Sequence, residues 1–244
     1  MMKQGWHSIL TKTEQDNSTS FIGGKPCIPK NEPLPTCKVC GEPLTFFFQI
    51  AFPEGHMWAG KSLAFFYCTC AYHKHDAKQQ FPPAINTGTI DDLFNIPDGE
   101  INPETYQTLF RAIFFDTADG VLREDYKEKV AYQRIDWKNS RKKNKKTPII
   151  IAGDAIWSAS YGKERPATYG GKSMELVLQV ADYFNFEKLD DAPPEMKKTY
   201  QKDKPFKPRE ENDYTFFFDF NRVYLWGTVE PENPSFWLNV QNDI

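Results

Sequence analysis

The chain has 244 residues, of which 40% are hydrophobic and 26% charged, and its formal net charge is −3. This composition is typical of a globular protein that can bury a core, and we expect a single domain over residues 1–244, built from two related halves at about 20–140 and 148–244. No apolar run reaches the roughly 20 residues that a membrane-spanning helix needs, so we expect no membrane partner and a cytoplasmic location.

The chain order of apolar segments predicts strands first and a helix later. "LTFFFQIAF" and "SLAFFYCTC" are rich in aromatic residues and are separated by the Gly and Pro of "PEGHMWAGK", which predicts a hairpin. In "INPETYQTLFRAIFF", Asn102 and Pro103 suit a helix start, and a stripe with helical spacing follows at Tyr106, Leu109, Phe110 and Ile113. "KVAYQRIDW" and "IIIAGDAIW" predict two further strands. We therefore expect an α+β fold.

Two parts of the sequence echo one another. Gly23-Gly24-Lys25 recurs as Gly170-Gly171-Lys172, and Phe48-Gln49-Ile50 recurs as Leu178-Gln179-Val180. An aromatic strand follows each copy, "SLAFFYC" in the first half and "DYTFFFDF" in the second. A repeated order of motifs predicts a tandem duplication of two sheet-rich halves that share a core.

The cysteines predict a metal site in the first half. A C-x2-C pair is followed by Gly41, and a C-x-C pair ends the next strand, so a hairpin would bring four sulfurs together around one tetrahedral zinc ion. The four predicted ligands of this structural, zinc-ribbon-like hairpin are Cys37, Cys40, Cys68 and Cys70. The C-x-C spacing also allows His73 or His75 to replace one thiolate, and the alternatives to zinc are buried thiols or a redox pair.

Two glutamines lie inside apolar strands, Gln49 in the first half and Gln179 in the second. A buried amide without partners costs about 1–3 kcal/mol, so each must be hydrogen-bonded. We expect the amides to bond loop backbone near the Gly-Gly segments. The alternative is that both line a ligand groove.

Few residues suggest catalysis. Asp116, Asp119 and Asp154 follow apolar runs and could act as acid and base in a metal-independent hydrolase, although Asp near Gly is more typical of a turn. The basic run from Arg141 to Lys146 favours a solvated loop over a nucleic-acid contact, because the chain is acidic overall and no aromatic residues interleave the charges.

Short motifs resemble two families. "GGKPCIPKNEPLPTC", followed by "PLTFFFQI" and later by "LVLQV", resembles the YwqG-like family, bacterial proteins of unknown function whose fold is an α+β tandem duplication. "CKVCGEPLTFFFQI" followed by "SLAFFYCTC" resembles the zinc-bearing part of the Tsr4 and programmed-cell-death-protein-two family, which implies a dedicated chaperone role and hence protein binding.

Three functions follow from these observations. The first is a zinc-containing, non-catalytic protein-binding module that serves a dedicated partner or acts as an immunity-like factor. The second is the hydrolase that uses Asp116, Asp119 or Asp154. The third is nucleic-acid binding through Arg141 to Lys146.

Overall fold

The computed structural model describes most of the chain, as residues 3–37, 41–69, 110–142, 144–157, 168–169, 172–181, 184–197, 207–208, 212–214, 221–229 and 236–242. Within these ranges the backbone forms β-strands, and the helical content is one 3-10 turn at Thr117–Asp119. The expected α+β class is therefore wrong, because the described part of the protein is almost entirely β.

The helix expected after Asn102 is wrong at its described end. Phe110–Asp116 forms strand β6, in which Ile113 and Phe115 are buried as alternate residues. Phe110 and Ile113 fit helical spacing in the sequence, but a strand buries this short apolar run equally well. The residues from Asn102 to Leu109 lie outside the described residues.

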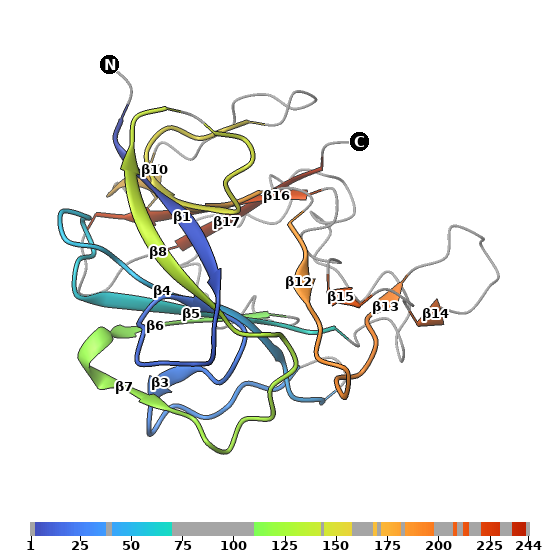
Figure 1. The fold of residues 1–244 in the computed structure, drawn as a ribbon. Coiled ribbons are helices and arrows are strands. Elements are labelled where there is room, and N and C mark those ends of the chain that lie inside the picture. Colours follow the sequence, from blue (N-terminus) through green and yellow to red (C-terminus); the bar gives the residue numbers. More distant parts are fainter. Residues whose placement is uncertain are drawn as a thin grey trace.

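The described strands form one large antiparallel sheet and three short ribbons (Figure 1). The sheet strands are β1 (Gly5–Lys12), β2 (Phe21–Ile22), β4 (Thr45–Ala51), β5 (Lys61–Tyr67), β6 (Phe110–Asp116), β8 (Gln133–Ser140), β9 (Ile149–Ala152), β10 (Thr168–Tyr169), β11 (Lys172–Val180), β16 (Asn221–Thr228) and β17 (Phe236–Asn242). The ribbons pair β3 (Cys27–Pro29) with β7 (Gly120–Leu122), β12 (Phe186–Glu187) with β15 (Asp213–Tyr214), and β13 (Met196–Lys197) with β14 (Lys207–Pro208).

The order of the sheet strands divides the sheet into two matched parts. The order is β17-β16-β11-β9-β1-β8-β2-β4-β5-β6, and β10 pairs with β11. We name β8-β2-β4-β5-β6 the first half-sheet and β1-β9-β11-β16-β17 the second half-sheet. β1 precedes β2 in the chain but pairs with β9, and β8 precedes β9 but pairs with β2. If the chain is divided just before β8, the first strand of each part, β1 or β8, lies in the half-sheet formed by the other part. β1 and β8 lie side by side (Figure 1).

The register of the two half-sheets also matches. Gln49 of β4 lies opposite Phe21 of β2, and Gln179 of β11 lies opposite Ile150 of β9. The pairing of β4 with β5 shifts by one residue between Phe46 and Phe48, and the pairing of β11 with β16 shifts between Leu176 and Leu178. The two half-sheets thus share connectivity, register and the place of a bulge. An origin by tandem duplication stays a prediction.

The connection that follows β4 packs on the second half-sheet. Trp58 of this connection is fully buried, and its indole nitrogen donates to the carbonyl oxygen of Thr228 at 3.1 Å. Its ring lies over Gly227 of β16, where a Cβ atom would stand 2.2 Å from the Trp58 side chain. Gly227 therefore provides the space that Trp58 needs.

The connection that follows β11 packs in turn on the first half-sheet. The ring of Phe186 meets Phe47 of β4 edge to face, with ring centroids 4.8 Å apart. Tyr214 lies 6.1 Å from the same ring and donates its hydroxyl to the Pro193 carbonyl. Each connection therefore packs its aromatic side chains on the half-sheet to which it is not directly joined.

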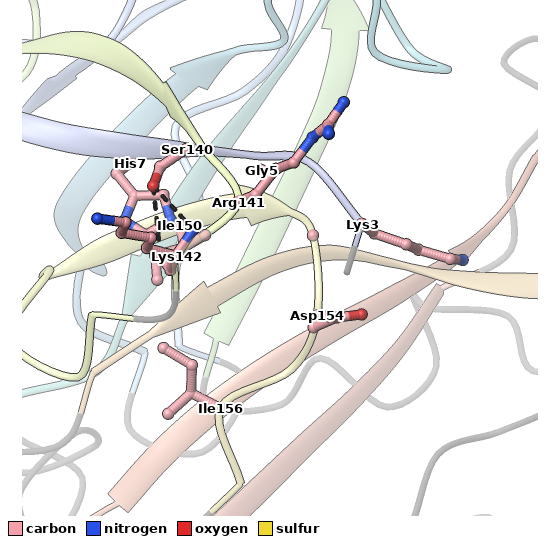
Figure 2. A pocket seen from close by; sticks show the side chains of 10 residues that line it. Lys3, Gly5, His7, Ser140, Arg141, Lys142, Ile150, Asp154 and Ile156 are labelled. Atoms are coloured by element: carbon pink, nitrogen blue, oxygen red, sulfur yellow. Dashed lines mark hydrogen bonds between the residues drawn. The ribbon is translucent and has the colours of Figure 1, made fainter. Parts of the chain in front are cut away.

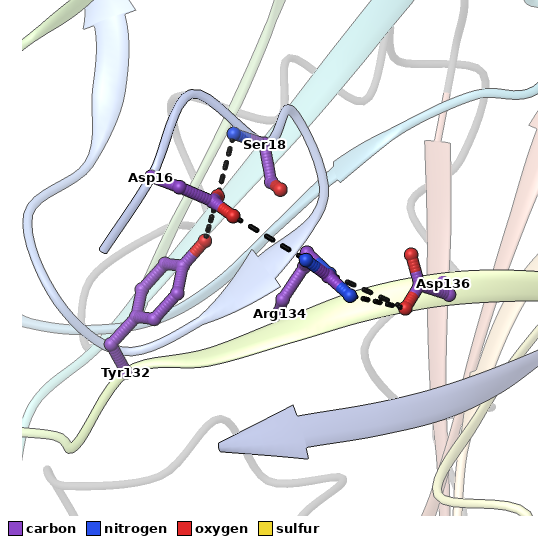
Figure 3. Close-up of polar contacts among 5 residues, drawn as sticks. All are labelled: Asp16, Ser18, Tyr132, Arg134 and Asp136. Atoms are coloured by element: carbon purple, nitrogen blue, oxygen red, sulfur yellow. Dashed lines mark hydrogen bonds and ion pairs between the residues drawn. The ribbon is translucent and has the colours of Figure 1, made fainter. Parts of the chain in front are cut away.

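A polar network holds the connection between β1 and β2 against β8 (Figure 3). Asp16 accepts hydrogen bonds from the Ser18 amide at 2.9 Å and from the Tyr132 hydroxyl at 2.8 Å. Hydrogen bonding by the Ser18 side chain, then by Tyr132 and the Ser18 amide, lowers the pKa of Asp16 to about 2. The guanidinium of Arg134 lies 3.6 Å from Asp16 and 3.2 Å from Asp136. The network fixes the path by which the chain leaves β1 for the other half-sheet.

Candidate functional site

Gln49 is buried and bonds backbone groups on both sides of its amide. Its exposed fraction is 2%, its oxygen accepts the Cys27 amide at 3.0 Å, and its nitrogen donates to the Thr19 carbonyl at 3.4 Å. The amide therefore ties β4 to the segments that flank β2.

Gln179 has the same role in the second half-sheet. Its exposed fraction is 1%, its oxygen accepts the Ile156 amide at 2.9 Å, and its nitrogen lies 3.5 Å from the Asp154 carbonyl. The side-chain amides of Gln49 and Gln179 both contact backbone groups. These contacts favour the expectation that the amides bond loop backbone over the alternative that they line a ligand groove.

The segments bonded by the two glutamines begin with two residues at positive φ. Gly23 and Gly24, which follow β2, have φ of 61° and 66°, and Ala152 and Gly153, at the end of β9, have φ of 54° and 78°. The counterpart of the first Gly-Gly pair in the fold is thus Ala152-Gly153. The Gly170-Gly171 pair of the sequence echo is not this counterpart, since it directly precedes β11 in the sequence.

The first predicted zinc ligand lies at the tip of a short hairpin that leads into β4. Thr36 and Pro43 form an antiparallel bridge, and beyond it the amide of Cys37 donates to the carbonyl oxygen of Glu42 at 2.8 Å. The amide of Gly41 returns to the Cys37 carbonyl, also at 2.8 Å. Cys37 is buried, and the tight turn after it is what a chelating C-x2-C pair requires.

Cys68, the first residue of the second predicted pair, directly follows β5, the strand that pairs with β4. Cys68 is buried in the same apolar cluster as the first cysteine, and the hydroxyl of Thr69 hydrogen-bonds that of Thr45 at 2.9 Å. Cys40 and Cys70 lie outside the described residues, as do His73 and His75. The described part of the chain contains no group of three metal-ligating side chains, and zinc stays a prediction.

The three candidate carboxylates lie in different places. Asp116 ends β6 and pairs with Lys61 at 2.7 Å, and Asp119 is exposed in the turn that follows. Asp154 follows β9 in the second half-sheet and lines a small pocket together with His7 and Ser140 (Figure 2). Five sheet strands separate β9 from β6 in the strand order, so Asp154 belongs to a different half-sheet from the other two.

The basic run forms the exposed turn between β8 and β9. The amide of Lys142 bonds the Ser140 hydroxyl at 3.0 Å, and the amide of Lys146 bonds the Asn144 side chain at 3.1 Å. Asx-type and serine-type bonds of this kind define turns. The basic side chains described here, including Arg141, are exposed to solvent.

A cleft of about 450 Å³ lies where the β4–β5 connection meets the second half-sheet. Its apolar wall includes Trp6 of β1, Met57 of the connection and Leu176 of β11. Two carboxylates, those of Glu54 and Glu175, also line it. The sequence did not indicate this cleft, because its walls come from three distant segments.

His56 lies in the wall of this cleft and is 7% exposed. Its ring stacks on Phe52 with centroids 4.7 Å apart, and Nδ1 accepts the Trp58 amide at 3.1 Å. Nε2 has no hydrogen-bond partner among the described residues. Burial lowers the pKa of His56 to about 4, so at neutral pH the ring is uncharged and Nε2 carries the proton.

No protein-family model matches the chain, and no curated protein matches it. The described residues include no helix with the length and apolar character to span a membrane. The geometry of the chain itself is therefore the basis for a functional proposal.

Proposed function

We propose that this protein is a non-catalytic, zinc-stabilised protein-binding module that holds a segment of a dedicated partner in the cleft beside β11. The observation that carries the proposal is the composition of the cleft. Trp6, Met57 and Leu176 line the cleft together with the carboxylate of Glu54, a combination suited to a peptide segment with apolar and basic side chains. The second carboxylate, Glu175, is paired with Lys3 of the same wall at 2.5 Å.

The placement of the candidate catalytic residues supports a binding role. A carboxylate pair that works as acid and base must meet around one substrate, and Asp154 lies in a different half-sheet from Asp116 and Asp119. The zinc hairpin would serve the module by fixing the start of β4, the strand whose connection to β5 supplies one wall of the cleft.

Affinity capture from native cell lysate tests the proposal with two matched variants. Met57→Glu places a charge in the cleft wall, and Ile9→Glu makes the same kind of change at a residue of β1 that is 50% exposed outside the cleft. We expect one protein to be retained by the wild type and by Ile9→Glu and lost with Met57→Glu. Retention of the same proteins by all three would contradict the proposal.

A further inference from the structure

The part of the chain around the β8–β9 connection carries positive charges without negative ones. Residues 137–153 contain six Lys or Arg and no Asp or Glu, although the net charge of the whole chain is −3. Five of these cations are described and exposed, namely Lys138, Arg141, Lys142, Lys145 and Lys146. In the part of the chain that the structure describes, no carboxylate pairs with any of the five. They form a basic patch that the described residues leave uncompensated.

The connection that carries most of these charges is anchored to β1. The hydroxyl of Thr147 contacts Nδ1 of His7 at 3.2 Å, and the amide of Ile149 donates to the Ser8 hydroxyl at 3.1 Å. We name residues 141–142 and 144–148 the basic turn. Because these bonds already hold the end of the basic turn, less conformational entropy is lost when a partner binds to it.

The basic turn and the cleft meet at the start of β1. Arg141 lines the small pocket of Figure 2 together with Lys3 and Gly153. Lys3 and Gly153 also line the cleft. Trp6 lines the cleft and His7 lines the small pocket, and consecutive residues of a strand point to opposite faces of the sheet. A segment that leaves the cleft at Lys3 therefore reaches the basic turn by passing around the start of β1.

Carboxylates border the basic turn and limit the length of an anionic ligand. Asp154 lines the small pocket, and Glu175 is paired with Lys3 at the cleft. On β8, Asp136 is paired with Arg134. A nucleic-acid strand carries a charge on every nucleotide and binds along a continuous basic surface, which these carboxylates interrupt. A short acidic stretch of a protein fits between them.

We propose that the partner segment held in the cleft continues into a short acidic stretch, and that this stretch lies on the basic turn. Its carboxylates pair with the exposed cations of the turn, beginning at Arg141 beside the small pocket. The apolar and basic residues of the segment stay in the cleft, beside Glu54. Opposite charges at the two ends of the segment fix the direction in which it lies. This inference rests on the proposed function and names the chemistry of the part of the segment outside the cleft.

Two pairs of synthetic peptides test the acidic stretch. The fluorescein-labelled peptide Lys-Leu-Trp-Leu-Gly-Ser-Gly-Glu-Glu-Asp-Glu is compared with a peptide in which Gln and Asn replace Glu and Asp, and the second pair has the reverse order of residues. Fluorescence polarisation with the full-length protein at about 150 mM salt reports binding. We expect the acidic peptide of one pair to bind about tenfold more tightly than its amide counterpart, a difference that shrinks as salt is added.

Matched charge reversals locate the acidic stretch. The double variant Arg141→Glu, Lys142→Glu should bind the acidic peptide no more tightly than the amide peptide. The double variant Lys12→Glu, Lys127→Glu changes the net charge equally at two exposed lysines outside the cleft and the small pocket, and it should bind like the wild type. Equal losses in the two double variants overturn the inference. Equal affinities for acidic and amide peptides, or no binding of any of the four, overturn it as well.

A labelled DNA duplex is the competing ligand. At the same salt concentration, we expect the duplex to bind more weakly than the acidic peptide, because the bordering carboxylates repel a long polyanion. Tighter binding of the duplex that is lost in the Arg141→Glu, Lys142→Glu variant would show that the basic turn contacts nucleic acid, and the acidic-stretch inference would be wrong.

The two proposals fail in different ways. If partner capture depends on Met57 but the acidic and amide peptides bind alike, the cleft is a binding site and the acidic-stretch inference is wrong. If capture is indifferent to Met57→Glu, the proposed function is wrong whatever the peptides do.

Discussion

In the first half-sheet the hydroxyl oxygen of Tyr126 accepts the Phe46 amide at 2.7 Å, whereas Leu176, at the matching position of the second half-sheet, lines the cleft. The two otherwise share strand order, the place of the bulge, a buried glutamine and a pair of residues at positive φ. The comparison teaches that matching positions of the two half-sheets are packed by different aromatic side chains, Tyr126 on Phe46 in the first and Trp157 on Trp226 beside Leu176 in the second.

Zinc removal should have the largest effect and should act through the first half-sheet. We expect about one zinc ion per chain, and Cys37→Ser should remove it and lower the melting temperature strongly, because coordination energy appears as folding energy. Cys27→Ser, at a half-buried cysteine outside the predicted ligand set, is the control. Metal analysis measures the zinc content, and thermal melts compare the two variants. If the purified wild-type protein contains no zinc and both variants have the same melting temperature, the zinc prediction is wrong.

Gly23→Ala should be the most damaging change at the paired turns. A Cβ atom at Gly23 would stand 2.3 Å from the Ala131 carbonyl oxygen, at a φ of 61°. The strained backbone and the clash together should cost about 3 kcal/mol of unfolding free energy. The matched change Ala152→Gly relieves a positive φ instead and should be neutral or gain about 0.5 kcal/mol. Denaturant unfolding measures the unfolding free energy of both variants. If both variants lose the same amount of unfolding free energy, the two turns do not correspond.

Stability should fall as pH falls through the range in which His56 titrates. The pKa of this buried ring is lowered from 6.5 to about 4, so the unfolded chain binds a proton first. The contribution is fully present above about pH 6.5 and is lost toward pH 4, up to about 3 kcal/mol. Measured by urea unfolding between pH 7 and pH 4, the unfolding free energy should change less steeply with pH for His56→Gln than for the wild type. An unchanged slope would show that His56 is not held neutral by the fold.

The glutamine pair should give smaller and equal effects. Gln49→Leu leaves the Cys27 amide without its acceptor, and Gln179→Leu does the same to the Ile156 amide. Each should cost about 1–3 kcal/mol. Unfolding free energies that differ widely between the two variants would show that the two half-sheets are less alike than their registers indicate.

Strands with continuous apolar runs were predictable from the sequence. Thr45–Ala51 and Ile149–Ala152 lie within the predicted runs, and Lys61–Tyr67 begins one residue before its run, because burial on both faces requires apolar residues throughout. Phe110–Asp116 was mistaken for the end of a helix, since its few apolar residues fit both periods.

The match of the two turns could not be read from residue identity. The positive φ that glycine provides after β2 is adopted by Ala152 at the end of β9, so the Gly-Gly-Lys echo indicated the wrong residues. The buried glutamines were recognisable, because an amide within an apolar strand must find partners. The cleft was not, since pairing across the sheet brings Trp6, Met57 and Leu176 together from distant parts of the chain.

The exchange of β1 and β8 between the half-sheets has a consequence for how the protein is made. β1 leaves the ribosome before the other described strands, yet both of its neighbours, β8 and β9, are synthesised more than 110 residues later. The first half-sheet likewise has to wait for β8 before β2 is paired on both sides. Pairings between such distant segments form slowly, so β1 stays without its final neighbours in the growing chain until β8 and β9 have been translated.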